Sequence, residues 1–193
     1  MPEDFTLTEA VTLPNNFVTV FHAITTDLGL ETPWPKPDGY VPERFDDKVL
    51  IWGGSSSVGQ FAIQVLRYYG YTNILATASR KHHEKLRALG AQDVSDYNDP
   101  DVISSISKMG DIPLVLDCIG SQSGSIAPIA GIAKSGAKVA ILLPVIVRDS
   151  SETRDPEYEM DVWRAAAWAT GVDVRGVRTH FYPEVSSVDP TVW

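Results

Sequence analysis

The sequence predicts an α/β fold in which helices cover both faces of a doubly wound parallel sheet. Three observations support this prediction. Short apolar runs alternate with amphipathic segments from residue 49 onward, the segments are long enough for βαβ crossovers, and a glycine- and serine-rich turn joins the first run to the next helix. With 193 residues and a hydrophobic content of 44%, the chain suits one globular domain with its own core.

The apolar runs and the amphipathic segments give the expected order of elements. Strands are expected at 49–52, 74–77, 114–119, 139–143 and 172–177. Helices are expected at about 15–28, 58–69, 82–89, 100–108, 123–134 and 157–170. Four prolines and a glycine between residues 33 and 43 interrupt regular structure. We therefore divide the chain into a linker helix with its connector over 1–43 and a Rossmann-like three-layer αβα domain over 44–193.

The charge balance and the absence of long apolar runs argue against two classes of partner. Twenty-five acidic and 16 basic residues give a formal charge of −9, which repels nucleic acid and anionic membranes. No apolar run approaches the ~20 residues needed to span a bilayer, and residues 1–10 lack the basic and apolar regions of a signal peptide. We therefore expect a cytoplasmic protein that binds neither nucleic acid nor membranes.

The most informative segment is the turn after the first expected strand. Gly54 and Gly59 occupy the outer positions of a G-x-G-x-x-G pattern, while Ser56 stands at its middle position. Small side chains let the backbone approach a pyrophosphate, and the N-terminus of the following helix offers unpaired N–H groups to it. We therefore expect a phosphate-binding turn here. The alternative is a tight glycine- and serine-rich turn without a ligand.

A second signal lies about 20 residues beyond this turn, at the end of the second expected strand. An NAD-type domain places Asp or Glu there, on the adenosine ribose. This sequence instead has Ser79, Arg80, Lys81 and His82. A hydroxyl followed by Arg and Lys suits the 2′-phosphate of NADP(H), which Arg binds in fork geometry and Lys as a point charge. The alternative is an exposed, charged helix start.

Several separate stretches, in the same order, resemble the cofactor domain of the medium-chain dehydrogenase/reductases. The resemblance points to the zinc-free branch with the quinone-oxidoreductase-like proteins and the fungal trans-acting enoyl reductases of polyketide pathways. The matching stretches are Val49–Gly59, Ala76–Ser79, Leu89–Tyr97, Leu114–Gly120 and Ser135–Leu142. The segment Glu9–Leu28 is similar to the helix that leads into this domain, so the resemblance covers about residues 6 to 180.

The resemblance implies a set of cofactor-binding residues and leaves the catalytic residues unassigned. They fall into three groups along the cofactor: Gly54, Ser55, Ser56, Ser57, Val58 and Gly59 on the pyrophosphate; Ser79, Arg80, Lys81, His82 and Tyr97 around the adenosine and its 2′-phosphate; and Cys118, Ile119, Gly120, Leu143 and Pro144 on the nicotinamide side. The alternative for Tyr97 is a half-buried aromatic residue at a strand end. The alternative for Cys118 is a small apolar core residue, since no basic group near it in the sequence lowers its pKa.

The resemblance also implies a function. We expect the nucleotide-binding domain of an NADP(H)-dependent oxidoreductase that transfers hydride to an activated C=C bond, as in an enoyl thioester, or to a quinone. The family's N-terminal GroES-like catalytic domain and its C-terminal return segment are absent from this sequence, so we expect cofactor binding with little catalysis. The alternative is a non-catalytic nucleotide-binding module or a partner of a polyketide synthase; a methyltransferase is a third and more distant reading. The last expected strand, 172–177, predicts a homodimer formed by strand addition.

The sequence offers few metal ligands. Cys118 is the only cysteine, so no cysteine-built zinc site can form within one chain. The histidines lack the i, i+4 spacing of a helical metal pair; they are His22, His82, His83 and His180. We therefore expect no metal site in this chain.

Elemental analysis of the purified, tag-free protein is expected to give far less than one zinc per chain, because the sequence lacks a tetrahedral set of ligands. A full equivalent of zinc that survives dialysis would contradict this prediction.

Overall fold

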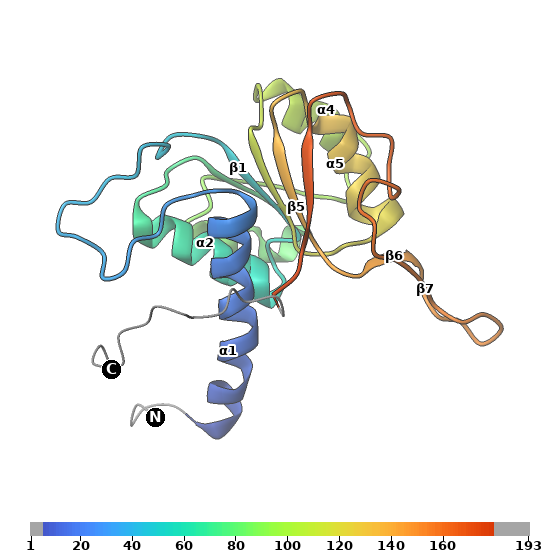
Figure 1. The fold of residues 1–193 in the computed structure, drawn as a ribbon, viewed down its shortest axis with the longest axis horizontal. Coiled ribbons are helices and arrows are strands. Elements are labelled where there is room, and N and C mark those ends of the chain that lie inside the picture. Colours follow the sequence, from blue (N-terminus) through green and yellow to red (C-terminus); the bar gives the residue numbers. More distant parts are fainter. Residues whose placement is uncertain (1–5, 180–193) are drawn as a thin grey trace, which may run out of the picture.

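The computed structural model of the chain describes residues 6–179, and a single parallel sheet of six strands forms its centre (Figure 1). The strands are β1 (Val49–Trp52), β2 (Ile74–Thr77), β3 (Asp93–Ser95), β4 (Leu114–Asp117), β5 (Lys138–Leu142) and β8 (Asp173–Val177). Their order across the sheet is β3-β2-β1-β4-β5-β8. The chain therefore winds outward from β1 in both directions, which confirms the doubly wound Rossmann-like fold.

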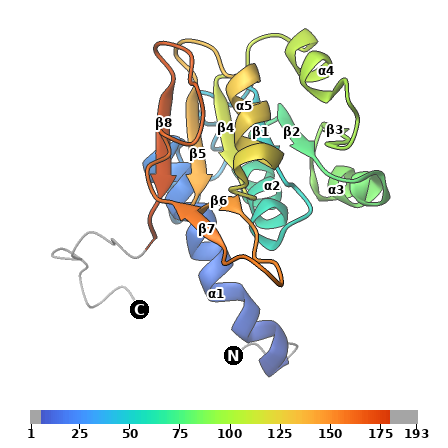
Figure 2. The same cartoon turned by 90° about the vertical axis from the view of Figure 1, so that its right-hand side faces the viewer.

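Helices cover both faces of this sheet and complete three layers (Figure 2). They are α1 (Leu7–His22) with its π-helical extension η1 (Ala23–Asp27), α2 (Ser57–Tyr69), the 3₁₀ turn η2 (Arg80–His82), α3 (His83–Leu89), α4 (Val102–Lys108), the π-helical turn η3 (Gln122–Ile126) and α5 (Ala127–Ile132). The end of α1, η1, α2 and α3 bury one face. The other face lies under α4, η3, α5 and the segment 162–165.

The short central strands are apolar along their whole length because both of their faces are buried. Val49 and Ile51 pack in the core beneath α2, whereas Leu50 and Trp52 pack in the core beneath α5. All four residues are at most 2% exposed. This two-sided burial is why β1 is a continuous apolar run rather than an alternating one.

The first helix is longer than expected. It begins at Leu7 rather than near residue 15, and Pro14 lies inside it. The N-terminal half of α1 extends beyond the sheet (Figures 1 and 2), and Leu7 and Val11 there are 79% and 75% exposed. The expected start rested on the apolar spacing from Phe17 to Leu28, which leads into the buried core at Ile24 and Leu28, so this pattern placed the start of the helix too late.

The expected helix at 157–170 is wrong. The segment 145–159 instead forms an antiparallel hairpin of β6 (Val145–Arg148) and β7 (Glu157–Glu159), which projects from the body of the domain (Figure 1). Irregular turns follow the hairpin: Asp161 accepts a hydrogen bond from the amide of Trp163 at 3.0 Å, and the indole of Trp168 donates to the carbonyl of Val162 at 2.9 Å. These side-chain bonds compete with a helical ladder.

The remaining differences are small. The other helices begin and end within two residues of the expected positions. Strand β4 ends at Asp117 rather than at residue 119, and β5 begins and ends one residue early. Strand β3 was not expected, because it has three residues and only Val94 is fully buried. Within residues 6–179, no helix has both the length and the apolar character needed to cross a bilayer.

Helix α2 packs unusually close to the turn that precedes it, and Gly59 makes this approach possible. A Cβ atom on Gly59 would lie 2.6 Å from the carbonyl oxygen of Gly53 and 2.8 Å from the Cα atom of Gly54. Backbone atoms cannot move aside as the tip of a flexible side chain can. Gly54 is also confined, since its Cβ would lie 3.0 Å from that of Ala76.

Replacing Gly59 by Ala is therefore expected to lower stability by about 1–3 kcal/mol, which shifts Tm downward by roughly 2–12 °C in a domain of this size. Thermal unfolding followed by circular dichroism measures this shift. The matched control is Gly131→Ala in α5, where a Cβ would meet only Ile103 at 3.7 Å. Alanine favours a helix more than glycine does, so the control variant should be neutral or slightly stabilised. Equal Tm values for G59A and G131A would contradict the prediction.

Candidate nucleotide-binding site

The candidate site lies along the carboxyl ends of the parallel strands. Strand β1 is paired on one side with β2 and on the other side with β4. The turn at residues 53–56 leaves the sheet at this central position, where the winding direction changes. In open α/β sheets this is the place where ligands bind.

Three hydrogen bonds from backbone amides hold the turn in place. The amide of Gly53 donates to the Oγ1 atom of Thr77 at 3.1 Å, and the amide of Gly54 donates to the Thr77 carbonyl at 2.8 Å. The amide of Ser56 in turn donates to the carbonyl of Gly53 at 3.0 Å. Thr77 is completely buried at the end of β2. Sequence reasoning did not single out Thr77, although a hydroxyl at the end of an apolar strand is a usable signal.

The turn presents the N-terminus of α2 toward the solvent side of this edge. Ser56 is the N-cap residue, and its Oγ accepts a hydrogen bond from the amide of Gly59 at 3.1 Å. Gln60 donates from its side chain to the carbonyl of Ser55 at 2.8 Å. The amides of Ser57 and Val58 open the helix, where no earlier turn supplies carbonyl acceptors. The side chain of Val58 is buried, so this residue can reach a ligand only through its backbone.

This arrangement fits a pyrophosphate group. A Cβ atom at Gly54 would meet Ala76 and Leu86, and one at Gly59 would meet the backbone of Gly53 and Gly54, so these glycines let α2 lie directly behind the turn. The opening turn of α2 adds the positive end of the helix dipole. The residues expected on the pyrophosphate are thus brought together at one place.

A second group of expected residues lies at the end of β2. Ser79 precedes η2, and Arg80, Lys81 and His82 form it. The side chain of Arg80 is 81% exposed, and its Nε atom lies 3.2 Å from Oδ2 of Asp96. The structure thus places an acidic residue beside Arg80 that sequence reasoning missed, because Asp96 follows β3 rather than β2.

Asp96 and Tyr97 form the outer end of this group. The pKa of Asp96 is lowered, chiefly by the hydrogen bond from the backbone amide of Asn98 and further by Arg80. Tyr97 is 44% exposed at the end of β3. In addition, His83 Nε2 lies 2.9 Å from the carbonyl oxygen of Ala78, a contact that ties the start of α3 to the strand end.

The third group surrounds the end of β4. The amide of Cys118 donates to the carbonyl of Trp52 at 2.9 Å. A Cβ atom on Gly53 would lie 2.5 Å from the side chain of Ile119. The Ile119 side chain therefore packs against Gly53, although Ile119 is 44% exposed. Gly120 has φ +66°, and its Cβ would lie 2.6 Å from the carbonyl oxygen of Leu142. The residues after β4 that are expected on the nicotinamide side therefore adjoin both the turn at residues 53–56 and the end of β5.

Leu143 and Pro144 complete this third group. They follow β5, and a Cβ on Gly120 would lie 3.3 Å from the carbonyl oxygen of Pro144. The amide of Ile146 donates to the carbonyl of Gly120 at 2.7 Å. These contacts bring the segment after β5 against the segment after β4.

Cys118 is not a candidate nucleophile. Burial raises the pKa of its thiol, the nearby carboxyl of Asp117 raises it further, and a hydrogen bond with Ser56 lowers it only partly. A nucleophilic cysteine needs the opposite shift. The interpretation of Cys118 as a small, inert residue beside the site fits this environment.

The order of the strands sets the order of the three groups. Across the sheet, the Arg80 group at β3 and β2 comes first, the turn after β1 second, and the Ile119 group at β4 and β5 third. The spatial order of these groups is the order of the adenosine, pyrophosphate and nicotinamide parts of a dinucleotide. One extended ligand can therefore contact all three groups along one edge of the sheet.

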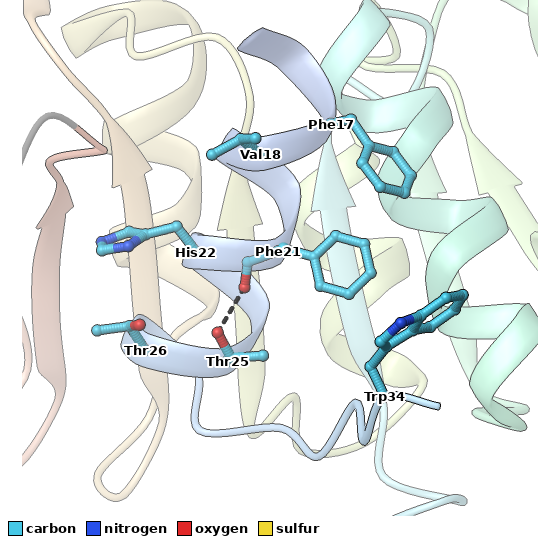
Figure 3. A pocket seen from close by; sticks show the side chains of 7 residues that line it. All are labelled: Phe17, Val18, Phe21, His22, Thr25, Thr26 and Trp34. Carbon is cyan, nitrogen blue, oxygen red and sulfur yellow. Dashed lines mark hydrogen bonds between the residues drawn. The ribbon is translucent and has the colours of Figure 1, made fainter. Parts of the chain in front are cut away.

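An apolar groove of about 570 Å³ lies elsewhere, on α1 and η1 (Figure 3). It is lined by Phe17, Val18, Phe21, His22, Thr25, Thr26 and Trp34. Trp34 is 81% exposed, and the hydroxyl of Thr25 is used internally in a hydrogen bond to the carbonyl of Phe21 (Figure 3). None of the residues that line this groove belongs to the three groups of the candidate site. Sequence analysis did not predict it.

Within the described range, no three His, Cys, Asp or Glu side chains are grouped to hold a metal ion. Of the four histidines considered as ligands, His180 lies outside the described residues.

The chain resembles known oxidoreductases in sequence and in fold. Residues 57–154 match the family model described as "Zinc-binding dehydrogenase". The trans-enoyl reductase eqxC of Fusarium heterosporum is 30% identical over 185 residues, which is 95% of this chain and 50% of that protein. Four yeast relatives are matched over only 29–31% of their own length. The chain therefore spans about a third to a half of these relatives.

Two solved structures show the same architecture. The quinone oxidoreductase of Coxiella burnetii has a TM-score of 0.56 and 26% identity, over 73% of this chain and 38% of that one. The CurK enoyl reductase has a TM-score of 0.67 over 93% of this chain and 47% of that one, and at 18% identity it shows the shared fold alone.

Together with the strand order and the glycine-rich turn, the family match confirms the resemblance found in the sequence. The chain belongs to the zinc-binding dehydrogenase family, within the medium-chain dehydrogenase/reductase superfamily, and covers its cofactor-binding part.

Proposed function

We propose that this chain is the nucleotide-binding part of an NADP(H)-dependent oxidoreductase that reduces an activated C=C bond, such as that of an enoyl thioester, or a quinone. The observation that carries the proposal is the alignment of three residue groups, in dinucleotide order, along the carboxyl ends of β3, β2, β1, β4 and β5. The names of the related proteins, a trans-enoyl reductase and a quinone oxidoreductase, support this choice of reactions.

In this proposal, each group has a distinct task. The amides of Ser57 and Val58, with the small residues of the turn, hold the pyrophosphate. Ile119 and Gly120 form part of the wall against the nicotinamide, and Leu143 and Pro144 extend that wall from β5. The nicotinamide supplies the hydride when it is bound, while this chain orients the ring and excludes water from one side of it.

The preference for NADP(H) rests on Arg80 and Lys81. Both follow the β2 end, where the 2′-phosphate of NADP(H) would lie. Asp96 opposes this preference in part, since its carboxylate neutralises Arg80. A dianionic phosphate would offer Arg80 two negative charges, whereas Asp96 offers one. Binding of NADP(H) therefore favours a pairing of Arg80 with the phosphate in place of Asp96.

The proposal also includes partners. The substrate is a small molecule or an acyl thioester, presented in the second case by a polyketide synthase in the cytoplasm. Strand β8 lies at the edge of the sheet, with Arg175 held by Asp173 at 2.8 Å, and strand addition at this edge would give a homodimer. A non-catalytic nucleotide-binding or synthase-partner module is the second candidate, favoured by the absence of an evident proton donor at the β4 edge of the described chain.

NADPH is expected to bind more tightly than NADH, and the double variant Arg80→Ala/Lys81→Ala should lose most of this difference, because charge-assisted bonds to a phosphate contribute about 1–3 kcal/mol. Intrinsic tryptophan or NADPH fluorescence titration gives both dissociation constants. The matched control is the double variant Lys85→Ala/Arg87→Ala, which removes two exposed cations on α3 and should keep the preference.

The variant Asp96→Asn should strengthen NADPH binding, because it frees Arg80 from its carboxylate partner. Equal constants for the two cofactors in the unaltered protein would overturn the proposed preference.

This chain alone is expected to oxidise NADPH at a rate near background with crotonyl thioesters or small quinones, even though it binds the cofactor. The side chains at the β4 edge are those of Cys118 and Ile119, and neither is suited to polarise a carbonyl. Positioning of the substrate can contribute roughly 7–11 kcal/mol to a barrier, so an incomplete pocket reduces turnover by orders of magnitude. Saturable turnover that a mutation within this chain abolishes would show that the pocket is complete here.

A further inference from the structure

Asp117, the last residue of β4, is a buried carboxylate that has no cationic partner among the described residues. Its side chain is completely buried. One carboxylate oxygen accepts hydrogen bonds from the amides of Ile119 at 2.9 Å and Gly120 at 3.2 Å, and the other accepts one from the hydroxyl of Ser125 at 2.7 Å. Among the ion pairs of residues 6–179, none includes Asp117.

The hydrogen bonds of Asp117 do not require its charge. An asparagine in the same place would accept the two amides through its oxygen and donate from its amide nitrogen to the Ser125 oxygen, and the Ser125 proton could then go to the carbonyl of Ser121, which lies 3.0 Å away. Burial of the ionised group is unfavourable, and it raises the pKa of Asp117 to about 6 despite its three hydrogen bonds. At neutral pH the carboxyl is still mostly ionised. The fold therefore maintains a negative charge that loop geometry alone does not demand.

The position of this charge is specific. Asp117 lies directly before Cys118, Ile119 and Gly120, the group that adjoins the phosphate turn and the end of β5. A carboxylate in a buried site is poorly screened by solvent, so its field extends into the space in front of this loop. The two redox forms of a nicotinamide differ by one positive charge on the ring, and a nearby anion favours the oxidised form.

We propose that Asp117 is a positioning residue that sets the redox-state preference of the site: it shapes the loop 118–120 and its charge favours the oxidised, cationic nicotinamide over the reduced, neutral one. This inference rests on the proposed function, since it needs a nicotinamide cofactor in the site. Asp117 acts through the loop and through space and does not touch the ring.

The dependence on pH follows from the charge. Cys118 is the titratable group that interacts electrostatically with Asp117 among the described residues, and its thiol stays neutral because its pKa is raised. The other contacts are the Ser125 hydroxyl and two backbone amides. When the pH falls through about 6, Asp117 takes up a proton and the preference for the oxidised cofactor should decline. Above this pH the preference should be constant.

The test compares the dissociation constants of NADP⁺ and NADPH for the 193-residue chain and for Asp117→Asn, by isothermal titration calorimetry at pH 7.5. Loss of the charge should weaken NADP⁺ relative to NADPH by about three- to tenfold, the range expected for one charge pair that is separated by a loop rather than in contact. The matched control is Asp111→Asn. Asp111 precedes the same strand at its opposite end, is exposed and pairs with Lys134, so its loss should leave the ratio unchanged.

A change in loop structure alone would alter both constants and leave their ratio unchanged, and this result would overturn the electrostatic role. The ratio measured in the unaltered protein from pH 5 to 8 is a second test, independent of whether the variant folds. The ratio should shift toward NADPH below pH 6 in the unaltered protein and not in Asp117→Asn. A flat ratio in the unaltered protein would overturn the inference while leaving the proposed function intact, whereas failure to bind either nucleotide would overturn both.

Discussion

The close packing of α2 against the turn at Gly53 and Gly54 is the constraint on which the rest of the site depends. Gly59 permits this approach, and the two bonds from the turn to Thr77 fix the turn against β2. A side chain at position 59 would push the start of α2 away from the turn, and the opening amides of the helix would move with it. Because of this contact, the positive end of the α2 dipole and the backbone of the turn face the same place at the carboxyl edge of β1.

The same turn also links the two halves of the sheet. Ile119 from the β4 side lies against Gly53, and Cys118 interacts with Ser56. On the β2 side, Gly54 packs against Ala76. The turn is therefore the common neighbour of the groups that we assign to the adenosine and nicotinamide ends. A shift of the turn would move both ends relative to each other, so a single rigid element sets the span of the ligand.

The sequence predicts best the elements whose residues are buried in a continuous run, such as the central strands. It predicts least the contacts between residues that are far apart in the chain. Strands β1 and β2 were predicted to the residue, because continuous apolar runs end sharply at polar or glycine residues. The helix expected at 157–170 failed, because local side-chain bonds such as Asp161 to Trp163 diverted an alanine-rich segment. Asp96 was missed because it meets Arg80 only after β3 pairs with β2. No spacing in the sequence gives that pairing.

The net negative charge of the chain is unfavourable for the binding of a negatively charged dinucleotide. The formal charge is −9, so the overall field opposes the ligand. The candidate site could offset this repulsion with two local features. One is the set of backbone amides at the start of α2, and the other is the exposed Arg80, which now pairs with the carboxylate of Asp96. Backbone dipoles act within the first turn of the helix, whereas the exchange of Asp96 for a phosphate at Arg80 is a competition between charges at the surface. In the proposed site, pyrophosphate affinity and cofactor choice would therefore be physically separable, since we assign the first to the turn after β1 and the second to the ends of β2 and β3.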